Sequence, residues 1–149
     1  MPDTKKLLIL VHPGSACGSA DFNLGDEGPV ARGALAREIM DWPHDMLIVD
    51  GALSDELAFY PVMGIAIENT LDQNDRLVVR EVACDFTVEK WPEKVAKKLS
   101  EMWPGGPHDV RITGAWLHED GSGCVNAVKE AIAPSGHRIE ISATALLLP

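Results

Sequence analysis

The stretch that decides the fold is Leu-Leu-Ile-Leu-Val-His-Pro-Gly, residues 7–14. Its first five residues are aliphatic without interruption, whereas a strand with one face in water would alternate apolar and polar side chains. A short unbroken run of this kind is typical of a strand buried on both faces inside a parallel sheet. We therefore expect a β-strand over residues 7–11, followed by a loop that begins at His12.

Helical and extended patterns alternate along the rest of the chain. Helical patterns cover residues 29–42, 54–72, 91–102 and 122–132. Short apolar runs typical of strands cover residues 46–49, 77–83, 110–117 and 139–141. Prolines and glycines end the helical patterns, and we expect Ser122 to cap the last helix.

Strands that alternate with helices are joined by right-handed crossovers, which produce a parallel sheet with helices on both faces. The sequence therefore predicts an α/β protein, with a three-layer α/β/α arrangement and a mostly parallel sheet of five or six strands. Its 149 residues are the length of one ordinary domain, so we expect a single domain over residues 1–149. A hydrophobic fraction of 46% indicates a globular chain rather than a disordered one.

Charge and cysteine content limit the partners and the compartment. The chain carries 13 basic and 23 acidic residues, a net charge of −10, which disfavours nucleic acid and anionic membrane surfaces as partners. The apolar run at residues 7–11 is shorter than the roughly 7 to 15 residues of a signal-peptide core. Three cysteines without a Cys-x-x-Cys pair suit a reducing compartment. We expect a cytoplasmic protein that binds a small molecule, and we leave open whether it is a homo-oligomer.

Polar residues gather where the expected strands end. In parallel α/β sheets the ligand crevice lies at the carboxyl ends of the strands. The candidate ligand-binding residues at that edge are Gly14, Ser15, Cys17, Gly18, Ser19, Asp85, Trp116 and Glu119. The opposite edge offers only His44, His108 and His137, which we expect to be surface residues.

Cys124 is the sharpest candidate for chemistry at this edge. It follows Gly-Ser-Gly and is expected near the second position of the last helix, where amide N–H groups and the helix dipole stabilise a thiolate. Either His12 or His118 could then act as the base, with Asp120 or Glu119 orienting it. The alternative is that Cys124 is a small buried residue that packs beneath the sheet.

The surroundings of Cys124 resemble a known family. Residues 110–116 (VRITGAW), 123–128 (GCVNAV) and 136–139 (GHRI) are similar to the C-terminal half of the isochorismatase-like cysteine hydrolases. In that family a strand ends in glycine and the nucleophilic cysteine opens the next helix in a Cys-Val pair. The resemblance implies a hydrolase in which Cys124 attacks a small amide or ester.

Two catalytic positions of that family differ in this chain. The family's aspartate at the end of the first strand is replaced by His12, and its lysine position holds Arg80 or Glu81. The loop before Cys124 is also longer than the family's turn. The sequence therefore leaves two readings open, a rewired hydrolase with His12 as base and a catalytically degenerate relative.

A second resemblance points to a different class of protein. Residues 14–21 (GSACGSAD) resemble the phosphate loop of flavodoxins, which implies a binding or redox module that holds a phosphorylated ligand or a flavin. The alternative is a flexible loop without a ligand. For residues 118–120 (His-Glu-Asp), neighbouring side chains of an extended chain point to opposite sides, so we expect no metal site there. No cofactor is expected for the hydrolase.

Overall fold

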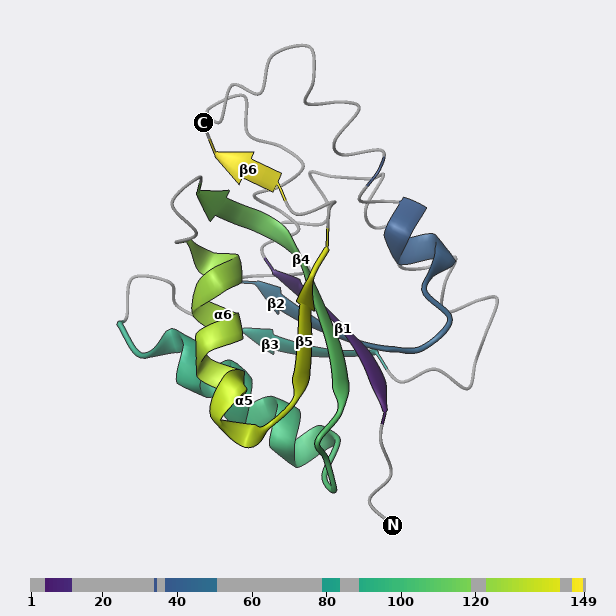
Figure 1. Cartoon of the computed structure of the whole chain (residues 1–149), viewed down its shortest axis with the longest axis vertical. Coiled ribbons are helices and arrows are strands. Elements are labelled where there is room, and N and C mark those ends of the chain that lie inside the picture. Colours follow the sequence, from purple (N-terminus) through teal and green to yellow (C-terminus); the bar gives the residue numbers. More distant parts are fainter. Residues whose placement is uncertain are drawn as a thin grey trace.

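The computed structural model describes residues 5–11, 34, 37–50, 79–83, 89–118, 123–142 and 146–148. Its elements, in chain order, are β1 (Lys6–Val11), β2 (Asp45–Asp50), β3 (Val79–Ala83), α5 (Trp91–Met102), β4 (Asp109–His118), α6 (Cys124–Ile132), the short 3-10 helix η2 (Ala133–Ser135), β5 (Arg138–Ile141) and β6 (Leu146–Leu148). Residues 37–41 are also helical. Figure 1 shows the strands side by side with α5 and α6 against them.

The described strands pair in parallel, in the order β3-β2-β1-β4-β5. β2 and β3 lie on one side of β1, and β4 and β5 lie on the other. Along the chain, β2 and β3 are therefore added on one side of β1, and β4 and β5 are added on its other side. The topological switch point of the sheet lies between β1 and β4. The predicted α/β fold with a parallel sheet is confirmed.

The last part of β4 pairs with a second short strand, β6. β5 pairs with the first part of β4 and β6 with its last part, and both run parallel to it. The sequence did not predict a strand at residues 146–148, because three leucines are too short a run to reveal a pattern.

β1 is buried on both faces, as its sequence predicts. Leu7 and Ile9 point to the face covered by α5 and α6, and the intervening Leu8 and Leu10 are equally inaccessible to solvent on the other face. The core cluster on the helix-covered face comprises Leu7, Ile9, Val11, Leu47, Val49, Val82, Trp91, Val95, Leu99, Trp103, Val110, Ile112, Val125, Val128 and Ile132. Each fully buried aliphatic side chain contributes about 1.5–3 kcal/mol to folding.

Helix α5 has the bounds that its sequence pattern predicts, because several local features agree. Val95 and Leu99 are four residues apart and both are buried. A proline lies in the first turn, where its missing N–H removes no helical hydrogen bond. The helix ends before buried Trp103, whose indole Nε1 donates a 2.8 Å hydrogen bond to Asp45 Oδ2 at the start of β2.

Among the described helices, none combines the length and the apolar character needed to cross a membrane.

The start of α6 differs from the prediction. The residue at the cap position is Gly123 rather than Ser122, so Cys124 is the first helical residue and not the second. Gly123 has a φ of 113°, a conformation that glycine adopts without strain and that serine would avoid. The expected helix over residues 54–72 lies outside the described residues.

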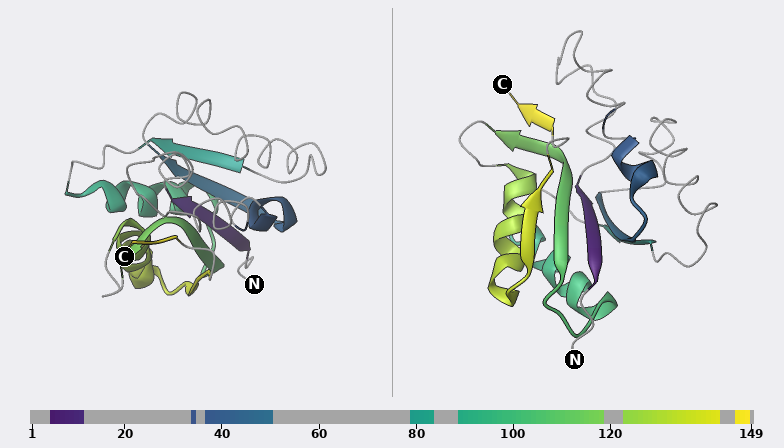
Figure 2. Two further views of the ribbon diagram at one scale, coloured as in Figure 1. Left: turned by 90° about the horizontal axis from the view of Figure 1, so that it is seen from above. Right: turned by 45° about the vertical axis from the view of Figure 1, so that its right-hand side comes forward.

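The second face of the sheet carries the helical residues 37–41. Glu38 contacts Arg111, which sits in β4 between the core residues Val110 and Ile112 and therefore points to the opposite face. Figure 2 shows this segment on the other side of β1 and β4 from α5 and α6. Described helical residues thus lie against both faces near β4.

Candidate functional site at the carboxyl ends of the strands

β1 and β4 approach each other closely at the topological switch point, where they pair. Val11, the last residue of β1, is the register partner of Gly114 in β4. Gly114 has a φ of 106°, and a Cβ at this position would fall on the backbone of Val11. Only glycine therefore permits this approach. Beyond it, β4 continues to His118, and the chain leaves β1 at His12.

Cys124 lies directly beyond this edge as the first residue of α6. Its side chain is half-buried and packs against the core cluster. The first intrahelical hydrogen bond runs from the Ala127 N–H to the Gly123 carbonyl at 2.9 Å, so the N–H groups of Val125 and Asn126 have no acceptor within the helix. Such amides and the helix dipole favour a thiolate and could also stabilise an oxyanion.

The remaining candidate residues fall into two groups. His118 and Trp116 lie in the last part of β4, where His118 is the register partner of Leu148 in β6. Outside the described residues are His12, Gly14, Ser15, Cys17, Gly18, Ser19, Asp85, Glu119 and Asp120. Figure 1 shows that α6 begins at the end of the sheet where β4 ends, and the convergence of the candidate side chains stays a prediction.

The two residues at the family's lysine position lie in β3. Arg80 pairs in register with Leu47 of β2, and Glu81 with Ile48. β3 is separated from β4 by β2 and β1.

The prediction that His108 is a surface residue is wrong. It is only 1% exposed, and its ring and backbone N–H together bond to three parts of the chain, at Lys5, Trp103 and His137. Its Nδ1 accepts a 3.0 Å hydrogen bond from the Lys5 backbone N–H, so its proton is on Nε2, which lies 2.6 Å from the Trp103 carbonyl oxygen. The sequence could not predict this burial, because the partners Lys5 and His137 are far from His108 along the chain.

His137 completes a histidine pair at the amino ends of the strands. Its Nδ1 accepts a 2.9 Å hydrogen bond from the backbone N–H of His108, and the two rings stack with centroids 5.4 Å apart. Burial, followed by the neighbouring His108, lowers the pKa of His137 from its ordinary 6.5. The two histidines join the chain just before β1, β4 and β5.

The second face of the sheet has two hollows. They are lined by Trp42, Arg111 and the helical residues Arg37, Glu38 and Asp41, among others. The sequence analysis did not single out this site, because its residues come from separate elements. Within the described ranges, no three His, Cys, Asp or Glu side chains gather closely enough to hold a metal ion.

Comparison with known protein-family models, curated proteins and solved structures finds no match to this chain.

Proposed function

We propose that the chain is a divergent isochorismatase-like hydrolase that uses the Cys124 thiol on a small amide or ester. The observation that carries the proposal is the position of Cys124 as the first residue of α6. This helix follows β4, the strand that pairs with β1 at the topological switch point. In sheets of this kind, ligands bind outside the carboxyl ends of the strands at that point.

The proposed reaction has two steps. His12 or His118 accepts the thiol proton, and the Cys124 sulfur attacks the substrate carbonyl carbon to form a tetrahedral oxyanion. Amide groups at the start of α6 stabilise the oxyanion, the histidine returns its proton to the leaving amine or alcohol, and a thioester remains. Water then hydrolyses the thioester and restores the thiol. Asp120 or Glu119 orients the histidine.

The architecture we propose for the whole chain is one three-layer α/β/α domain over residues 1–149. Support comes from α5 and α6 on one face of the sheet and helical residues 37–41 on the other. We propose a cytoplasmic location and a small-molecule substrate, since a net charge of −10 opposes nucleic acid and anionic membranes. The loop residues Gly14, Ser15, Cys17, Gly18 and Ser19, with Asp85, Trp116 and Glu119, would hold this substrate.

The strand order favours the hydrolase over the flavodoxin-like module. Flavodoxins have the order 2-1-3-4-5, in which only one strand lies beyond the first strand on that side. Here both β2 and β3 lie on the same side of β1. A flavin absorbance that remains with the purified protein would instead support the flavodoxin-like module.

Selective alkylation of thiols tests the proposal before a substrate is known. We expect iodoacetamide near pH 7 to label Cys124 ahead of Cys84, because the helix start lowers a thiol pKa. Peptide mapping by mass spectrometry measures this order. A Cys124 that stays unlabelled in the folded protein would show that it is only a packing residue.

A screen of small amides and esters then tests catalysis. Cys124→Ser and His12→Ala should abolish turnover, and Cys84→Ser is the matched thiol control that should retain it. With His12 as base, activity should fall with acid near a histidine pKa of about 6.5 rather than a carboxylate's roughly 4. If the folded protein turns over no substrate in the screen, the degenerate reading replaces the hydrolase.

A further inference from the structure

The second face of the sheet contains a hollow at the opposite end of the strands from Cys124. It has a volume of about 380 Å³ and lies between residues 42–44, before β2, and the first residues of β1, β4 and β5. A neighbouring hollow of about 350 Å³ shares Asp41, Trp42 and Arg111 with it. The volume is at the lower end of the roughly 300–1,000 Å³ of small-molecule sites, enough for a single-ring compound.

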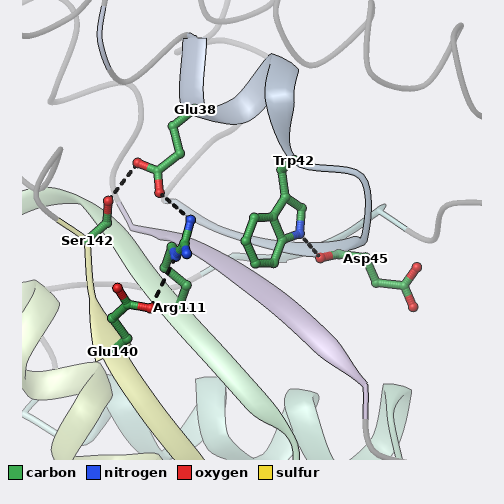
Figure 3. Close-up of polar contacts among 6 residues, drawn as sticks. All are labelled: Glu38, Trp42, Asp45, Arg111, Glu140 and Ser142. Atoms are coloured by element: carbon green, nitrogen blue, oxygen red, sulfur yellow. Dashed lines mark hydrogen bonds and ion pairs between the residues drawn. The ribbon is translucent and has the colours of Figure 1, made fainter.

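One wall of the hollow is a fixed aromatic surface. The Trp42 indole Nε1 donates a 2.9 Å hydrogen bond to the Asp45 backbone carbonyl oxygen, which Figure 3 shows. The ring of His44 meets the indole edge-on with centroids 5.5 Å apart. The guanidinium carbon of Arg111 lies 5.1 Å from the centroid of the indole ring. The indole is therefore held in place before any ligand arrives.

Arg111 gives this wall hydrogen-bond donors that the described residues do not use. Its Nη1 is 3.6 Å from Glu38 Oε1 and its Nε is 3.5 Å from Glu140 Oε2 (Figure 3). Charge-assisted hydrogen bonds are shorter, at about 2.7–2.9 Å. The Arg111 side chain is 37% exposed, so its guanidinium is accessible to a ligand.

A second cation lines the same hollow. Lys6, the first residue of β1, is exposed, and no described residue forms an ion pair with its ammonium group. Of the acidic residues in the lining, Asp109 faces Arg138 at 3.7 Å, whereas Glu140, whose side chain is 67% exposed, faces Arg111 itself at 3.5 Å. A ligand carboxylate would therefore replace the exposed Glu140 carboxylate beside Arg111 and would have Lys6 as its second partner.

We propose that this hollow binds a small planar organic carboxylate. The carboxylate contacts Arg111 and Lys6, since a guanidinium presents N–H donors in a fork that matches carboxylate oxygens. The planar part packs against Trp42 and His44, whose rings favour flat apolar groups. The site lies at the amino ends of the strands and does not depend on the role of Cys124.

Nuclear magnetic resonance of the tryptophan side chains tests this site with benzoate as the probe. In protein labelled with ¹⁵N, the Trp42 indole N–H peak, assigned from Trp42→Phe, should shift and saturate as benzoate is added. The Trp103 indole N–H is the internal reference, because it is buried on the other face and bonds to Asp45 Oδ2. Benzyl alcohol and benzylamine at equal concentration should shift the Trp42 peak much less.

Variants then separate the proposed contacts from general electrostatics. We expect Arg111→Lys to weaken benzoate binding about tenfold and Lys6→Gln about threefold, because a bidentate partner and a point charge are lost respectively. Lys97→Gln on α5 removes the same charge outside the hollow and should leave the affinity unchanged. The proposal is overturned if the Trp42 peak does not respond at about 20 mM benzoate, if benzyl alcohol acts equally, or if Lys97→Gln matches Lys6→Gln.

Discussion

At the scale of single residues, Gly114 leaves less room for a side chain than Gly105, Gly106 or Gly136. Its positive φ and the backbone of Val11 both exclude a side chain. Gly105 also has a positive φ, of 91°, but its missing side chain faces open space. Substituting Gly105 therefore measures the cost of the positive φ alone, whereas substituting Gly114 measures that cost together with the clash against β1.

We expect Gly114→Ala to lower the free energy of unfolding by about 3 kcal/mol or more, and Gly105→Ala by only about 1 kcal/mol. The first change must move β1 away from β4, whereas the second only strains a turn. Urea unfolding followed by circular dichroism measures both values. Equal losses in the two variants would mean that β1 and β4 can separate without penalty.

His137 links stability to pH. Its pKa in the folded protein is lowered from 6.5, so the unfolded chain binds this proton more readily than the folded one. The contribution of the neutral His137 ring to the free energy of unfolding is complete above pH 6.5, the ordinary pKa that applies in the unfolded chain. It is lost as the pH falls from 6.5 through the lowered pKa of the folded protein. A protonated Nδ1 could no longer accept the His108 N–H.

His137→Gln removes this titration and keeps a hydrogen-bond acceptor. The stability advantage of the natural protein over this variant should therefore shrink as the pH is lowered from about 7.5 to about 5. Urea unfolding at a series of pH values gives the difference. An advantage that stays constant over the series would contradict the role assigned to His137.

At the scale of elements, a partly buried hydrogen bond adds to the core packing that joins α5 to β2. Trp103→Phe removes the indole donor to Asp45 Oδ2 but retains most of the buried ring. We expect a loss of about 1–3 kcal/mol, since a partly buried carboxylate loses a donor. Asp45→Asn keeps an oxygen acceptor and should lose less. Thermal and urea unfolding compare the two, and a larger loss in Asp45→Asn would refute this expectation.

Elements with a complete local pattern could be predicted from the sequence. β1 and α5 were predicted within one residue, because the aliphatic run and the spacing of Val95 and Leu99 are properties of consecutive residues. The burial of His108 and the hollow beside Trp42 and Arg111 could not be predicted. Both depend on residues from separate elements, which only the folded chain brings together. The thiol of Cys124 was placed to within one position, and its proposed catalytic partners remain predictions.

At the scale of the whole molecule, β1 is far better protected from solvent than β5. β1 has neighbours on both sides and side chains buried on both faces. β5 instead alternates between exposed and half-buried residues. Local opening is therefore expected to begin at β5 and to reach β1 only on global unfolding.

Hydrogen exchange measured by mass spectrometry checks this order. Amide groups of β1 should exchange at the rate of global unfolding, and those of β5 at least about tenfold faster. The reference is α5, a helix whose buried face packs in the same core cluster as β1. If β5 exchanged as slowly as β1, the sheet would open as one unit.

The parallel direction of β1 and β6 gives the molecule two chemically different poles. Chain that precedes β1 enters at the pole with His108 and the Trp42 hollow, and chain that follows β6 leaves at the pole with Cys124. A tether attached ahead of β1 would therefore anchor the protein to a surface with its thiol facing the solution. The same tether attached after β6 would turn the thiol toward the surface and leave the hollow open to the solution.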